Sequence, residues 1–223
     1  MSRNVDYNAA PGIGAVLETN KVLRNTYLLL SMTLLFSAAM AAVSIALNLS
    51  HLVGLVLLLV GFGMLFWVHK TADSSQGLLA IFAFTGCLGL ALGPTLNHYL
   101  AMSNGSSLVL QAMGGTALIF LTLSGYVLTT RKDFSFMGGF LVTGLIVAIV
   151  AMLANLFFQI PALSLALSAV IVLIMSGFIL YDTSRIINGG ETNYIRATVG
   201  LYLSIYNLFT SLLHLLGAFG GDE

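Results

Sequence analysis

Seven apolar segments, each long enough to cross a lipid bilayer as a helix, account for most of this 223-residue sequence. A spanning helix needs roughly 17 to 25 apolar residues, because its backbone groups must pair internally inside the hydrocarbon core. The segments are residues 26–49, 52–68, 78–99, 108–130, 136–158, 162–187 and 194–219. Only 7% of the residues are charged, whereas a soluble domain carries about 25%. The sequence therefore predicts an all-α, polytopic membrane protein folded as a bundle of seven transmembrane helices.

The basic residues predict the orientation of this bundle. They occur only at alternate connections: Arg3, Lys21 and Arg24 before the first segment, Lys70 after the second, Arg131 and Lys132 after the fourth, and Arg185 and Arg196 around the last connection. Loops rich in Lys and Arg stay in the cytoplasm. We therefore expect a cytoplasmic N-terminus and, after seven crossings, a periplasmic C-terminus.

Three parts are expected along the chain. Residues 1–25 include Pro11, Gly12 and Gly14 and show little apolar periodicity, which predicts a mostly flexible cytoplasmic tail, with Glu18 as the candidate start of a helix. Residues 26–219 form the transmembrane domain, and residues 220–223 form a short periplasmic tail.

Small residues recur at helix-packing spacing within the segments. They make up six of the eight residues 37–44 (SAAMAAVS) in the first segment and appear as Gly86, Gly89 and Gly93 in the third. In lipid, close backbone approach at such residues holds helices together, so we interpret them as structural. Pro94 follows directly and is expected to kink or end the third helix.

Asp182 is the one carboxylate that the sequence places among apolar residues, where a charge is costly and usually functional. Two interpretations stay open. In the first, Arg185 pairs with Asp182 at helical spacing and only anchors the helix end. In the second, Asp182 faces the bundle and bonds to the last helix, where Ser204 and Asn207 lie on one face with Tyr206 beside them. We call Asp182, Arg185, Ser204 and Asn207 the polar cluster.

Other chemistries lack the residues that they need. No His, Cys and carboxylate side chains stand at metal-ligand spacing, and one carboxylate at membrane depth makes a calcium site weak. No lysine lies within a segment, which excludes a retinal Schiff base, and no protease motif or second buried aspartate is present. Eight basic and eight acidic residues cancel, which argues against a nucleic-acid partner. We expect no catalytic residues, no metal and no cofactor.

Several motifs resemble the Bax inhibitor family of seven-helix membrane proteins. Residues 86–96 (GCLGLALGPTL) are similar to its Gly-rich signature, and residues 181–183 (YDT) and 201–209 (LYLSIYNLF) resemble its last two helices. Four further stretches resemble a bacterial branch of the family: residues 21–27 (KVLRNTY), 82–86 (FAFTG), 126–133 (YVLTTRKD) and 189–198 (GGETNYIRAT). The resemblance covers nearly the whole chain beyond residue 20.

This resemblance implies a regulator in the bacterial inner membrane rather than an enzyme. Members of the bacterial branch associate with the membrane protease FtsH and its partners HflK and HflC, restrain the protease, and are degraded slowly from the N-terminal tail. The resemblance also implies an alternative function. Other branches are proposed calcium or proton leaks gated by two aspartates, of which Asp182 would be the first, while Ser204 replaces the second. Two touching carboxylates share a proton, which an aspartate and a serine cannot do.

Overall fold

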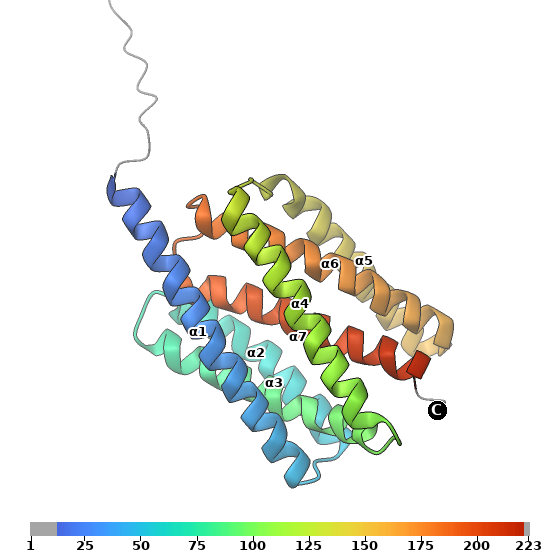
Figure 1. The fold of residues 1–223 in the computed structure, drawn as a ribbon. Helices are drawn as coiled ribbons and strands as arrows, with labels where there is room; N and C mark the ends of the chain where they lie inside the picture. The colour runs from blue at the N-terminus through green and yellow to red at the C-terminus, as the bar shows by residue number, and fades with distance from the viewer. Residues whose placement is uncertain (1–12, 221–223) are drawn as a thin grey trace, which may run out of the picture.

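The computed structural model describes residues 13–220, with side chains from residue 18 onward. The chain folds into seven long helices and one short 3-10 turn (Figure 1): α1 (Ile13–Ala46), α2 (His51–Thr71), α3 (Gln76–Leu100), α4 (Gly105–Thr130), η1 (Ser135–Met137), α5 (Gly138–Phe158), α6 (Pro161–Ile187) and α7 (Tyr194–Gly220). All seven helices are long and apolar enough to cross a membrane, which confirms the predicted number of spans.

The first helix begins earlier than the sequence predicted. Residues 13–25 were expected in the mostly flexible tail, with Glu18 as the candidate start of a helix, but α1 begins at Ile13, and its membrane-length part begins at Glu18. This stretch is rich in good helix formers such as Ala15, Leu17 and Glu18, which outweigh its weak apolar periodicity. Of the predicted N-terminal tail, residues 1–12 lie outside the described residues. At the other terminus, α7 includes Gly220, and only residues 221–223 lie outside them.

The helix α7 lies at the centre of the bundle. It contacts α1, α3, α4 and α6, while α2 packs mainly on α3 and α5 packs mainly on α6. The connections after α2, α4 and α6 meet at one end of the bundle, at the upper left of Figure 1. There Asn193 donates a 2.9 Å hydrogen bond to the Ala72 carbonyl, and the Phe134 N–H donates a 2.8 Å bond to Ser184. We call this the basic end, because the charged residues of these connections gather there.

The small residues of α1 and α3 bring the two backbones into contact. A Cβ placed on Gly89 would overlap the Ser37 carbonyl, and one placed on Gly93 would overlap the Ser44 side chain. Only glycine fits at such a distance, and this supports the structural interpretation of these residues.

The third helix runs through Pro94 and ends only at Leu100, so the proline does not end it. Proline has no N–H, so the carbonyl of Leu90 loses its donor within the helix. The Ser44 hydroxyl of α1 donates a 2.7 Å hydrogen bond to this carbonyl. The side chain of a neighbouring helix thus pairs the backbone group that the proline frees, as a membrane interior requires.

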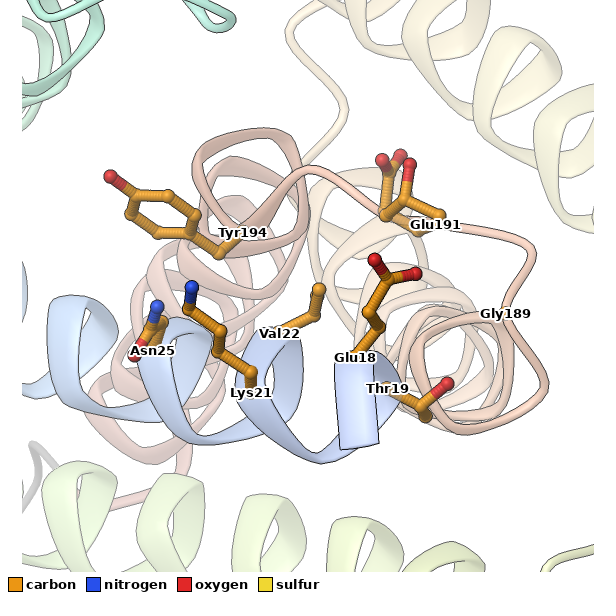
Figure 2. Close-up of a pocket in the computed structure, with 9 residues that line it drawn as sticks. Glu18, Thr19, Lys21, Val22, Asn25, Gly189, Glu191 and Tyr194 are labelled. Carbon is orange, nitrogen blue, oxygen red and sulfur yellow. The ribbon is translucent and has the colours of Figure 1, made fainter. Parts of the chain in front are cut away.

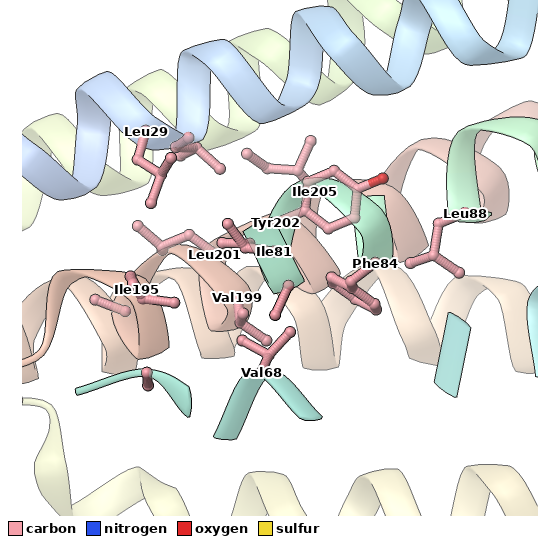
Figure 3. Packing of buried hydrophobic residues seen from close by; sticks show 14 of the residues in the cluster. Leu29, Val68, Ile81, Phe84, Leu88, Ile195, Val199, Leu201, Tyr202 and Ile205 are labelled. Carbon is pink, nitrogen blue, oxygen red and sulfur yellow. The ribbon is translucent and has the colours of Figure 1, made fainter. Parts of the chain in front are cut away.

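The largest buried cluster joins α1, α2, α3 and α7 around Tyr202 (Figure 3). The Tyr202 ring is 1% exposed and packs edge-on against Phe84, with ring centroids 5.7 Å apart. Its hydroxyl lies 2.7 Å from the Ser37 hydroxyl and donates a 3.4 Å hydrogen bond to the Thr85 carbonyl. The polar tip of this aromatic side chain is therefore paired inside the apolar core, which makes its burial favourable.

Candidate functional site

Asp182 lies in the last turns of α6, partly buried, and its carboxylate points at α7. A Cβ placed on Gly200 would lie 2.8 Å from Asp182 Oδ2. Because a side chain at position 200 would meet the carboxylate, the absence of one lets the two helices approach here. Within residues 18–220, no side-chain hydrogen bond or ion pair of Asp182 is present.

The two residues that follow Asp182 connect α6 to α4 and to the α4–α5 connection. The hydroxyl of Thr183 lies 3.2 Å from that of Ser124 in α4. Ser184 accepts a 2.8 Å hydrogen bond from the Phe134 N–H and lies 3.3 Å from Asp133 Oδ1. The end of α6 is therefore held on one side by paired hydroxyls, while Asp182 faces the opposite neighbour, α7.

Arg185 is directed toward the α6–α7 connection and not toward Asp182. Its guanidinium donates a 2.9 Å hydrogen bond to the Gly190 carbonyl, lies 3.6 Å from the Glu191 carboxylate, and sits 5.6 Å from the Tyr181 ring centroid. The turn that allows this begins at Gly189, which has a φ of 75° that favours glycine. Because the chain turns back under the helix end, Glu191 rather than Asp182 becomes the ion-pair partner of Arg185.

Ser204 and Asn207 lie on the face of α7 that the sequence suggested, but they form no hydrogen bond to Asp182. Ser204 is buried, and the Asn207 amide donates a 2.8 Å hydrogen bond to the Leu203 carbonyl of its own helix. The residue that meets Asp182 is Gly200, one turn before Ser204. Positions 200, 204 and 207 share one helical face, so this periodicity could have identified the glycine from the sequence.

An open groove of about 490 Å³ lies at the basic end, between the start of α1 and the α6–α7 connection (Figure 2). It is lined by Glu18, Thr19, Lys21, Val22, Asn25, Gly189, Glu191, Thr192 and Tyr194. Sequence reasoning did not identify it, because its two walls are more than 160 residues apart along the chain.

The predicted topology residues differ in their surroundings. Lys21 lines the groove, Arg24 and Arg131 are exposed, and Lys132 donates a 2.9 Å hydrogen bond to the Tyr126 hydroxyl. Arg196 forms an ion pair with Asp73 of the α2–α3 connection.

Asn193 directly precedes α7 and joins the α6–α7 connection to the α2–α3 connection. Its side-chain oxygen accepts bonds of 2.9 and 3.1 Å from the Ile195 and Arg196 N–H groups, as at a helix N-terminus, while its amide reaches Asp73 at 2.8 Å. Across residues 18–220, no group of three or more His, Cys, Asp and Glu side chains could hold a metal ion.

Comparison with known proteins agrees with the motif resemblance. The profile of the Bax1-I family, described as inhibitor of apoptosis-promoting Bax1, matches residues 19–221. The modulator of FtsH protease YccA from Escherichia coli strain K12 is 57% identical over 204 residues, which cover 91% of this chain and 92% of the relative. An Escherichia coli O6:H1 relative with the same identity and coverage is named inner membrane protein YccA. An uncharacterized membrane protein of Vibrio cholerae is 54% identical over 208 residues, covering 93% of both chains.

These findings confirm the family and the bacterial branch that the motifs suggested. The name of the Escherichia coli K12 relative describes a protease modulator, which agrees with the prediction that this chain is not an enzyme. The seven apolar helices of this chain, and the relative named inner membrane protein YccA, also agree with the predicted location in the bacterial inner membrane. The chain is therefore an inner-membrane protein that belongs to the Bax inhibitor family.

Proposed function

We propose that this chain binds and restrains an FtsH-type membrane protease, and is itself a slow substrate gripped by its N-terminal residues. The observation that carries this proposal is the 57% identity, over 91% of the chain, to a protein named modulator of FtsH protease. HflK and HflC, the partners implied by the motif resemblance, would join the same complex.

The proposed orientation places the basic end in the cytoplasm. Positive charge on short loops keeps them on the cytoplasmic side, and Lys70, Arg131, Lys132 and Arg196 all lie at this end. The start of α1 lies at the same end and projects past the other helices (Figure 1). An ATP-dependent protease in the cytoplasm could therefore reach residues 1–12 without unfolding the bundle.

The packing of the bundle supports slow degradation. Pulling on the N-terminus would first extract α1, whose backbone is in contact with α3 at Gly89 and Gly93 and whose Ser44 pairs the Leu90 carbonyl. Each of these contacts must break before the protease can advance, which raises the barrier to extraction.

The test compares the full chain with a deletion of residues 2–12, which leaves α1 and the groove intact. We expect the deletion to be degraded more slowly in cells than the full chain, to co-purify with the protease, and to inhibit it more strongly. The control replaces residues 2–12 by a scrambled sequence of the same length, which should be degraded like the full chain. Equal turnover of the deletion and the full chain would show that these residues are not the handle. Failure of the full chain to co-purify with the protease would remove the proposal as a whole.

A pH-sensitive cation leak along α6 and α7 is the second candidate. It is favoured by the Asp182 carboxylate, which faces α7 without a hydrogen bond among the described residues. It is disfavoured by Ser204, which stands where the leak mechanism needs a second carboxylate. Liposomes loaded with a calcium-sensitive dye would decide: the leak requires flux through the wild-type protein that Asp182→Asn abolishes, and equal flux or no flux excludes it.

A further inference from the structure

The connection between α4 and α5 is a basic and aromatic loop held at the membrane surface. Residues 131–134 separate two candidate spans, Gly105–Thr130 and Ser135–Phe158, so the loop is too short to leave the interface. We call residues 131–136 the interfacial loop.

Two cations of this loop have no acidic partner. At the same end of the bundle, Arg185 lies beside Glu191 and Arg196 pairs with Asp73. In contrast, the guanidinium of Arg131 has no hydrogen bond or ion pair within residues 18–220. Lys132 bonds only to the neutral Tyr126 hydroxyl and lies 5.5 Å from the ring centroid. Hydrogen bonding to Tyr126 raises the pKa of Lys132, so its charge persists at neutral pH.

The acid of the loop is hydrogen-bonded within the protein and forms no ion pair with these cations among residues 18–220. Asp133 Oδ1 accepts a 2.8 Å hydrogen bond from the Ser135 N–H and a 3.3 Å bond from the Ser184 hydroxyl. These bonds, those from Ser135 first, lower the pKa of Asp133 below its ordinary value. The carboxylate is therefore tied to the protein, and the two positive charges face outward.

The aromatic rings beside the cations form a continuous series. Phe134 lies between Tyr126 and Phe136, with ring centroids 6.3 and 6.4 Å apart. Phe136 is 80% exposed and opens the candidate span Ser135–Phe158. Aromatic rings at this depth sit among headgroups and upper acyl chains.

The backbone of Arg131 allows a substitution that removes its charge. It ends α4 in the left-handed region, with a φ of 52°, and its N–H donates a 2.8 Å bond to the Val127 carbonyl. Glycine is the residue that suits this position, and a side chain there is disfavoured. Arg131→Gly would therefore remove the guanidinium and relieve this backbone conformation at the same time.

We propose that the interfacial loop binds the phosphate headgroup of an anionic phospholipid, with Arg131 and Lys132 on the phosphate and Phe134 and Phe136 against the glycerol and upper acyl chains. This site rests on the position of the loop at the membrane surface and does not depend on the protease. Each cation near an anionic surface contributes about 1 kcal/mol, which corresponds to about fivefold in affinity.

Native mass spectrometry of the full-length protein, with phosphatidylglycerol or phosphatidylethanolamine added at equal concentration, tests this proposal. We expect the wild type to retain phosphatidylglycerol about 25-fold better than phosphatidylethanolamine, about fivefold for each of the two cations. Lys132→Gln, at a fully exposed side chain, should lower this preference about fivefold, and Arg131→Gly with Lys132→Gln should abolish it. Arg131→Gly should not lower the thermal midpoint, because glycine accepts the left-handed backbone.

The matched control removes two charges elsewhere at the basic end, by Lys70→Gln with Arg24→Gln. This variant should keep the wild-type preference. Equal retention of the two lipids by the wild type, or equal losses in the control and the loop variants, would overturn the proposal. The proposal would also be overturned if the loop variants retained the lipid unchanged but no longer co-purified with the protease. The loop would then be a protein-binding surface. If inorganic phosphate displaced the lipid at equal concentration, the loop would be a simple anion site, and this result would also overturn the proposal.

Discussion

The Oδ2 atom of Asp182 lies 2.8 Å from the point that a Cβ would occupy on Gly200, so the carboxylate of α6 and the backbone of α7 share one small space. This contact predicts that Gly200→Ala lowers the thermal midpoint in detergent, with a loss of about 1 kcal/mol from overpacking. Gly63→Ala is the matched control, since a Cβ there meets nothing within 4 Å.

A double-mutant cycle separates this contact from other effects of Gly200→Ala. Asp182→Ala removes the carboxylate, so adding Gly200→Ala to that variant should cost little, with a coupling of about 1 kcal/mol between the two sites. Additive losses would mean that the two residues do not share this space.

The hydrogen bond between Ser44 and the Leu90 carbonyl predicts a dependence on Pro94. Ser44→Ala should destabilise the protein by about 0.6 to 1.7 kcal/mol, the range for hydrogen bonds between membrane helices. In a Pro94→Ala background, the restored N–H pairs the Leu90 carbonyl, and Ser44→Ala should lose most of its effect. Ser31→Ala is the control, because this exposed hydroxyl bonds only within α1. An equal loss with and without Pro94 would contradict this explanation.

The contact of Gly89 with the Ser37 carbonyl predicts a large loss of stability for a substitution at position 89. A Cβ at position 89 meets backbone rather than a movable side chain, so α1 and α3 must separate. Gly89→Ala should cost about 3 kcal/mol or more and shorten the lifetime of the protein in cells. Gly139→Ala on α5, in open space, should leave the midpoint and the lifetime unchanged. A tolerated Gly89→Ala would mean that the helices are further apart than described.

The lowered pKa of Asp133 predicts an acid-dependent contribution of the interfacial loop. A carboxyl group whose folded pKa is lowered stabilises the protein above its unfolded pKa, near pH 4, and loses this contribution as the pH falls through the folded value. Asp133→Asn keeps an oxygen acceptor but has no charge to lose. The wild type should therefore have the higher thermal midpoint at pH 7, and the difference should shrink below about pH 4. A difference that stays constant with pH would exclude the carboxylate as its source.

Much of this fold follows from local properties of the sequence. The seven spans could be predicted because each apolar segment must satisfy its own backbone in lipid, independently of its neighbours. The close approach of α1 and α3 was indicated by the spacing of Gly89 and Gly93. The left-handed turn at Gly189 has a similarly local cause, since glycine after a helix tolerates a positive φ.

The candidate site was predictable only in part. Asp182 stood out because a carboxylate among apolar residues needs an explanation, and its presence is independent of the fold. The sequence suggested Ser204 and Asn207 as the α7 neighbours of Asp182, whereas its carboxylate meets Gly200. Arg185 was considered as its partner, whereas Glu191 takes that place. Periodicity identifies the face of a helix that points into the bundle, but not the axial position of that helix relative to its neighbour.

The sequence by itself determined the membrane class, the number of spans, the alternation of basic connections and the family resemblance, because these depend on short segments read one at a time. Only the tertiary structure decided that α7 is central, that Gly200 meets Asp182, and that the start of α1 and the α6–α7 connection share a groove. These features depend on the axial position and rotation of packed helices, which side-chain contacts between distant segments set together.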